Sequence, residues 1–172
     1  MLKIIGMILM VTAGIGIGYE KSRVLSRREK VLESLLHMET LLKGEIRCSN
    51  ASLYDAFCEM GEKLTGEYGE FLKETAVQMR NQTGEPFGEI FRRCAEKREF
   101  LQVLSLEERE GFLSLGEHLG YLDKEMQLRQ LDLYEEELIR LIGRLRAEMP
   151  EKKKIYQSLG ILGGILLAVL VW

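Results

Sequence analysis

The chain has 172 residues, enough for one ordinary domain, and its charge is nearly balanced, with 24 basic against 27 acidic side chains. A nucleic-acid-binding protein usually carries a clustered basic face, and nothing in this balance points to one. Only two prolines occur, Pro86 and Pro150. Their scarcity favours long helices, because an interior proline costs about 3 kcal/mol of helix stability.

Residues 4–19 and 155–172 carry no charged side chain, whereas every acidic residue and all but one basic residue lie between Glu20 and Lys154. As helices, residues 4–19 and 155–172 would be about 24 and about 27 Å long, slightly less than the ~30 Å hydrocarbon core of a bilayer. Bilayer thinning or snorkelling side chains can accommodate short spans. We therefore predict transmembrane helices in residues 1–19 and 155–172.

Basic residues border these segments on their inner sides. Before the first segment stand only Lys3 and the terminal amine, and no basic residue follows the second. The bordering residues are Lys21, Arg23, Arg27, Arg28 and Lys30 after the first segment, and Lys152, Lys153 and Lys154 before the second. By the positive-inside rule, residues 20–154 are predicted to be cytoplasmic.

A cleavable signal peptide is the alternative interpretation of the first segment. Met1-Leu2-Lys3 precedes an apolar stretch, and Gly14-Ile15-Gly16 offers small residues for cleavage, although no Ala-x-Ala pattern is present. Cleavage would leave a secreted helical protein anchored only at its C-terminus. The odd number of cysteines, which match no zinc or redox motif, is more typical of a reducing cytoplasm.

Between the two segments, apolar residues recur about every 3.6 positions, and no alternating strand pattern competes with this period. The fold class is therefore predicted to be all-α, with about six helices in a cytoplasmic bundle over residues 20–154. Capping residues, glycines and the prolines set their limits. The predicted helices are about 24–46, 52–64, 67–81, 86–101, 105–120 and 122–149.

Three groups of apolar residues mark the expected core of this bundle. The first helix presents Val24, Val31, Leu32, Leu35, Leu36, Met38, Leu42 and Ile46. The fourth presents Phe87, Ile90, Phe91, Cys94 and Leu101, and the last presents Leu131, Tyr134, Leu138, Leu141 and Leu145.

Two glycines four residues apart, Gly116 and Gly120, lie between the last two predicted helices, before Asp123 and Gln127. Glycine inside a helix costs about 1 kcal/mol relative to alanine, so the pair indicates a close backbone approach or a bend. In a structural interpretation, Gly120 ends one helix and Asp123 caps the next. In a functional one, the segment also binds a partner through Gly116, Glu117, Gly120, Asp123 and Gln127. Both interpretations stay open.

The predicted spans contain small residues spaced four apart, a pattern that lets helices approach closely in lipid. They are Gly14 and Gly18 in the first span, and Gly160, Gly164 and Ala168 in the second. We predict that the spans pack on each other or on membrane partners through these positions.

No catalytic constellation is visible, and neither a cofactor nor a metal is expected. The chain has only two histidines, His37 and His118, and no phosphate-binding loop of the Walker type. A membrane-bound signalling or phosphorelay module that uses His37 is the alternative function. It has little support, because no ATP-binding region follows that helix.

The glycine segment resembles part of a known protein family. Gly-Glu-x-x-Gly-x-Leu-Asp before a long charged helix is similar to the repeated cytoplasmic F domain of the platform protein of type II secretion and type IV pilus machines. Over its whole length, the chain resembles the stage III sporulation protein AB family of endospore-forming bacteria. The matching motifs are Leu115-Gly116-x-x-Leu119-Gly120-x-x-Asp123-x-x-x-Gln127, Lys152-Lys153-Lys154-x-Tyr156 and Ser158-Leu159-Gly160-x-Leu162-Gly163-Gly164.

This resemblance implies a platform-like, non-enzymatic subunit of a sporulation channel complex between mother cell and forespore. The protein would lie in the outer forespore membrane of the mother cell, with its central domain in the cytoplasm. Implied partners are a cytoplasmic secretion-type ATPase, stage III sporulation protein AA, and other membrane subunits of the same complex.

Overall fold

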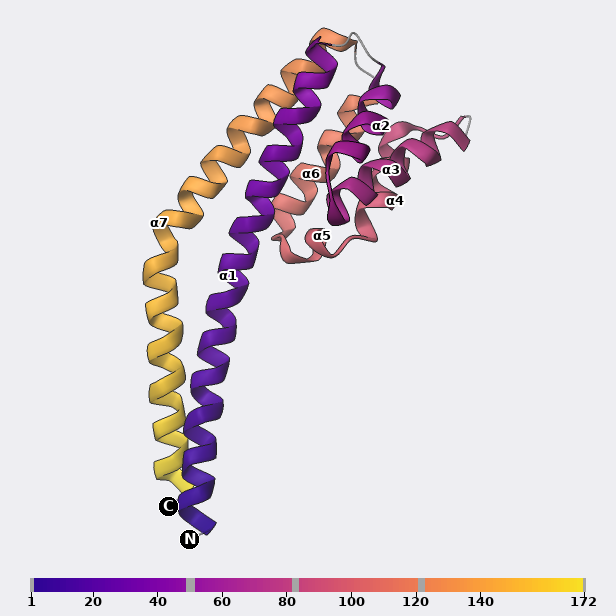
Figure 1. The fold of residues 1–172 in the computed structure, drawn as a ribbon. Coiled ribbons are helices and arrows are strands. Elements are labelled where there is room, and N and C mark those ends of the chain that lie inside the picture. Colours follow the sequence, from indigo (N-terminus) through magenta and orange to yellow (C-terminus); the bar gives the residue numbers. More distant parts are fainter. Residues whose placement is uncertain (1, 49–51, 82–83, 121–122, 172) are drawn as a thin grey trace. The chain divides into compact units, whose positions relative to one another are not determined.

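The computed structural model describes residues 2–48, 52–81, 84–120 and 123–171, and within them every regular element is an α-helix (Figure 1). This confirms the all-α class. The helices are α1 (Leu2–Cys48), α2 (Leu53–Lys63), α3 (Gly66–Asn81), α4 (Phe87–Glu96), α5 (Glu99–Val103), α6 (Leu106–Leu119) and α7 (Lys124–Val171).

The helices divide between two compact units. One, here called the bundle, is Val31–Leu141, and the other, the paired ends, comprises residues 1–30 and 142–172. Both α1 and α7 continue from one unit into the other without a break. The predicted limits at residues 19 and 154 were set by hydropathy, and they stay predictions.

Pro150 lies inside α7, although the sequence predicted that the last bundle helix would end near Met149. Proline fixes φ at a helical value and removes one N–H donor, so a long helix can continue past it with one hydrogen bond fewer. An ion pair between Glu148 and Lys152, at 2.6 Å, bridges the turn around the proline.

In the bundle, the predicted fourth helix is in fact two helices, α4 and α5. The chain is extended at Arg98 (φ −96°, ψ 140°), and its N–H donates to the carbonyl of Ala95 at 2.9 Å. The N–H of Phe100, at the start of α5, donates to the carboxylate of Glu67 at 3.0 Å. A side chain of α3 thus supplies an acceptor to the new helix start, a long-range contact that local periodicity does not predict.

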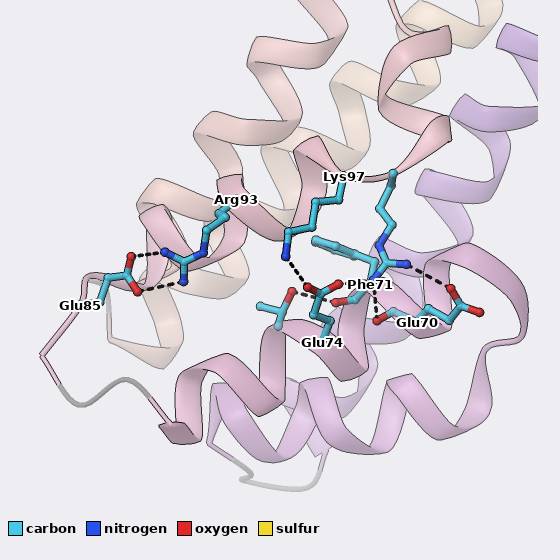
Figure 2. A network of polar contacts seen from close by, with 8 residues as sticks. Glu70, Phe71, Glu74, Glu85, Arg93 and Lys97 are labelled. Carbon is cyan, nitrogen blue, oxygen red and sulfur yellow. Dashed lines mark hydrogen bonds and ion pairs between the residues drawn. The ribbon is translucent and has the colours of Figure 1, made fainter.

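Acidic side chains of α3 also bind the basic residues at this break (Figure 2). The guanidinium of Arg98 contacts Glu70 at 3.0 Å and Glu74, and Lys97 contacts Glu74 at 2.7 Å. The hydrogen bond from Lys97 is the main reason that the pKa of Glu74 lies below its ordinary value. These contacts fix the α4–α5 break against α3.

The six phenylalanines of the chain form one continuous cluster at the centre of the bundle. Phe91 of α4 lies within it, 5.1 Å from Phe71 of α3 and 5.0 Å from Phe112 of α6 between ring centroids. The other members are Phe57 of α2, Phe87 of α4 and Phe100 of α5. The cluster joins five helices, because its members lie on α2, α3, α4, α5 and α6. Edge-to-face and tilted ring pairs contribute to stability beyond their buried area.

Most predicted core residues are buried, with exceptions at the margins. The whole predicted apolar set of the fourth helix is buried, including Cys94, which has a free thiol. Val24 is exposed and Leu36 is half-buried on α1, and on α7 Ile142 is buried where Leu141 is only partly so. Capping boxes start α2 (Ser52 with Asp55) and α6 (Ser105 with Glu108), at the predicted helix starts at residues 52 and 105.

In the paired ends, α1 and α7 run antiparallel, side by side (Figure 1). Arg146 contacts Glu29 at 2.7 Å, and Ser22, Ile142, Leu145 and Met149 are buried. Within the described residues, no helix is both long enough and apolar enough to cross a membrane, and the transmembrane helices therefore stay predictions.

One buried side chain of the bundle opposes its stability. The carboxylate of Glu39 on α1 is 1% exposed, and neither of its oxygens has a hydrogen-bond partner among the described residues. Desolvation raises its pKa to about 7, although Lys43 lowers it and Asp132 raises it further. The folded state therefore binds a proton at Glu39 more tightly than the unfolded chain does.

We predict that Glu39→Gln stabilises the bundle at pH 8 but not at pH 5. Above pH 7 the buried carboxylate is charged, at a cost of about 3 kcal/mol, because its pKa is about 7 in the folded chain and 4.5 for an ordinary glutamate. As the pH falls from 7 towards 4.5, the folded wild type takes up a proton and recovers this stability. Thermal unfolding of the detergent-solubilised chain, followed by circular dichroism, measures the effect.

The exposed carboxylate of Glu136 on α7 provides the control. Glu136→Gln should leave the pH dependence of the wild type unchanged. An advantage of Glu39→Gln that is the same at both pH values would contradict the assignment of this proton to Glu39.

Candidate functional site

Gly116 of α6 and Gly120, which caps the end of that helix, lie directly against two phenylalanines of α4. A Cβ atom on Gly116 would overlap the ring of Phe91, and one on Gly120 would lie 2.8 Å from the Cβ of Phe87. The two glycines are four residues apart, and so are the two phenylalanines. The two glycine–ring contacts therefore lie one helical turn apart. The expected close approach is confirmed, and Gly116 lies within a continuous helix rather than at a bend.

Gly88 of α4 makes the reciprocal contact. A Cβ atom there would lie 2.8 Å from the Cα of Glu117, which lies between Gly116 and Gly120 in the sequence. Each helix thus presents a glycine to the other, which brings their backbones closer than ordinary side chains allow. Sequence reasoning missed Gly88, although the matching four-residue spacing of Phe87 and Phe91 was a usable signal.

The connection from α6 to α7 is fixed by side chains. Gly120 ends α6 in a right-handed conformation (φ −74°), so it is needed for close packing and not for a left-handed turn. Asp123 accepts from the N–H of Met126 at 2.9 Å, as expected of a cap, and the amide of Gln127 donates to the carbonyl of Leu119 at 2.8 Å. Two positions of the predicted segment, 121 and 122, lie outside the described residues.

Glu117 is the exposed centre of this site. Its side chain is 51% exposed, and its carboxylate accepts a hydrogen bond from Arg92 of α4 at 2.7 Å. This contact is the main reason that the pKa of Arg92 lies above its ordinary value. An open pocket of about 290 Å³ lies beside the pair, and its lining includes Pro86, Gly88 and Glu89.

The five predicted partner-binding residues therefore differ in what they can offer. Glu117 and Asp123 present carboxylates at the surface, whereas Gly116 is buried against Phe91 and Gln127 is engaged with α6. Gly120 is exposed but close to Phe87. Their role in binding a partner stays a prediction, and any such role falls chiefly to the two carboxylates.

The small residues of the predicted spans are only partly described. Gly14 and Gly18 are helical in α1, and Gly160, Gly164 and Ala168 are helical in α7. Gly160 is half-buried, but the surroundings of the other four residues lie outside what the structure describes.

The two histidines lie on different helices, and His118 lines an open pocket of about 150 Å³ with Ser114 and Glu137. His37 is exposed on α1. His118 is exposed on α6, where its Nδ1 donates to the carbonyl of Ser114 at 2.7 Å. The arrangement suits surface helix residues.

We predict that Gly116→Ala destabilises the bundle by about 1–3 kcal/mol, as overpacking of a filled core does. Gly111→Ala is the matched control in the same helix. The nearest atom to a Cβ there is a flexible Glu137 carboxylate oxygen at 3.9 Å, so this substitution should stabilise by up to ~1 kcal/mol through helix propensity. Thermal unfolding measures both variants, and stabilisation by Gly116→Ala would disprove the close contact.

Comparison with known proteins gives one firm result. The model of the stage III sporulation protein AB (spore_III_AB) family matches residues 3–172, which is essentially the whole chain. No curated protein and no solved structure shows significant similarity to it.

Proposed function

Because the chain belongs to the stage III sporulation protein AB family, and is thus a sporulation-related protein, we propose that it is a non-enzymatic platform subunit of a secretion-like channel complex. In this role it connects a cytoplasmic ATPase to membrane subunits between mother cell and forespore. The observation that carries the proposal is the close packing of α4 against α6 at their glycines. This packing, with the ion pair to Arg92, holds Glu117 in place at the surface. Rigid presentation of charge lowers the entropic cost of binding a partner.

The proposed membrane attachment is supported by the amino-acid sequence. Residues 4–19 and 155–172 carry no charge, and basic residues border both on their inner sides. In this proposal the protein is an integral protein of the outer forespore membrane, and its bundle faces the mother-cell cytoplasm.

The proposed cytoplasmic partner is the sporulation ATPase, stage III sporulation protein AA. Glu117 and Asp123 would bind basic side chains of that partner, since charge-assisted hydrogen bonds are the strongest polar contacts. The membrane partners would pack against the small-residue faces of the two spans.

We predict that Glu117→Lys combined with Asp123→Asn weakens binding of the ATPase at least tenfold, because each lost charge-assisted contact is worth about 1.5–3 kcal/mol. Asparagine keeps the helix cap at position 123 and removes only its charge. Biolayer interferometry with the detergent-solubilised full chain measures the dissociation constant.

The matched control is Glu62→Lys with Glu136→Gln, which changes the net charge by the same amount at exposed positions elsewhere. Circular dichroism must show both double variants to be folded. Unchanged affinity in a folded Glu117→Lys/Asp123→Asn variant would remove this surface from the proposed role.

We also predict that Gly160→Leu with Gly164→Leu reduces recovery of membrane subunits in co-purification, because leucine prevents close helix approach in lipid. Gly143→Leu is the control, since open space surrounds this glycine of the same helix. Equal recovery from both variants would count against the small-residue face.

A further inference from the structure

Charge is divided sharply between the two compact units. Residues 20–30 and 142–154, which belong to the paired ends, contain ten basic and four acidic side chains. The bundle, residues 31–141, contains thirteen basic and twenty-three acidic ones. A chain of almost neutral total charge thus has one strongly basic segment pair and one strongly acidic body.

The two basic segments are far apart in the sequence but lie side by side. The 2.7 Å contact of Arg146 with Glu29 fixes the register of α1 against α7. The surroundings of Glu148 on α7 support the same register. The pKa of Glu148 is lowered chiefly by Lys152, and also by Arg144 and by Arg28 of α1. Both helices rise about 1.5 Å per residue. Eight residues further along the pair, Lys21 is therefore level with Lys154, to within about a helical turn.

At this level both helices carry exposed cations. We call them the basic collar: Lys21, Arg23, Lys152, Lys153 and Lys154. All are exposed except Lys153, which is half-buried. Two acidic residues, Glu20 and Glu151, share the level, so the collar keeps a net positive charge.

A tyrosine follows the collar on each helix, on the side of the uncharged segment. Tyr19 and Tyr156 are level with each other by the same register, and Tyr19 is 54% exposed. The guanidinium of Arg23 lies 4.9 Å from the centre of the Tyr19 ring. Tyrosine has an apolar body and a polar tip, and it concentrates where water meets lipid. Cations, then tyrosine, then uncharged residues occur in the same order on both helices.

From this alignment we infer that the basic collar binds the headgroups of anionic phospholipids, while Tyr19 and Tyr156 lie at the boundary between headgroups and acyl chains. The inference rests on the proposed membrane attachment and adds to it a lipid class and a depth of insertion. The two helices place five cations at one level, which matches a charged surface better than a compact ligand. The acidic bundle has no attraction for that surface.

The size of the expected preference follows from membrane electrostatics. A basic side chain near an anionic surface gains about fivefold in affinity, equal to ~1 kcal/mol. Because salt screens the charges, this gain falls off within about 10 Å of the membrane surface. The preference should therefore be lost at high ionic strength. A preference based on acyl-chain packing would persist.

The test reconstitutes the full chain into phosphatidylcholine bilayers that contain trace spin-labelled lipid. Electron paramagnetic resonance then gives the relative association constant of spin-labelled phosphatidylglycerol over phosphatidylcholine at the protein surface. The wild type should prefer phosphatidylglycerol about fivefold or more at low salt. Lys152→Gln/Lys153→Gln/Lys154→Gln should show nearly equal association of the two lipids.

The matched control removes three positive charges from exposed positions of the bundle, as Arg80→Gln/Arg129→Gln/Arg140→Gln, and should keep the wild-type preference. Equal association of both lipids with the wild type, or an unchanged preference in the collar variant, overturns the inference while leaving membrane attachment intact. Absence of motionally restricted lipid of either kind would instead overturn the membrane attachment itself, and the inference with it.

Discussion

The bundle depends on the packing of its phenylalanine cluster, because this one group of rings joins α2, α3, α4, α5 and α6. Rings of this size fill the space between helices, so α4 and α6 can meet closely only where one of them has no side chain. Gly88, Gly116 and Gly120 satisfy this condition. The surface that presents Glu117 is thus a direct product of how the core is filled.

Several polar groups at the edge of this core are satisfied by partners on other helices. Arg98 and the start of α5 rely on carboxylates of α3, and Gln127 reaches back to the end of α6. Glu39 departs from this pattern, since it is buried without a hydrogen-bond partner in the described part of the chain. Such a group lowers stability and makes it depend on pH.

The all-α class, the helix starts at Ser52 and Ser105 and most core positions were predictable, because they follow from local periodicity and capping. The break at Arg98 was not, since its cause lies on α3, nearly thirty residues earlier. At the site, the spacing of Gly116 and Gly120 indicated a close approach, but only the fold shows that α4 is the neighbour and that Gly88 and Arg92 belong to it.

The positions of the aromatic residues also determine which parts of the molecule contribute to its intrinsic fluorescence. Its rings are phenylalanines, with Tyr68 stacked on Phe100 and Tyr134 beside Phe112, and the single tryptophan of the chain is residue 172. Indole emission therefore originates at the carboxyl end of the chain, whereas Tyr68 and Tyr134 report on the bundle, and Tyr19 and Tyr156 on the paired ends. Selective excitation of the indole therefore follows the carboxyl end without any added dye, while tyrosine emission combines signals from both compact units.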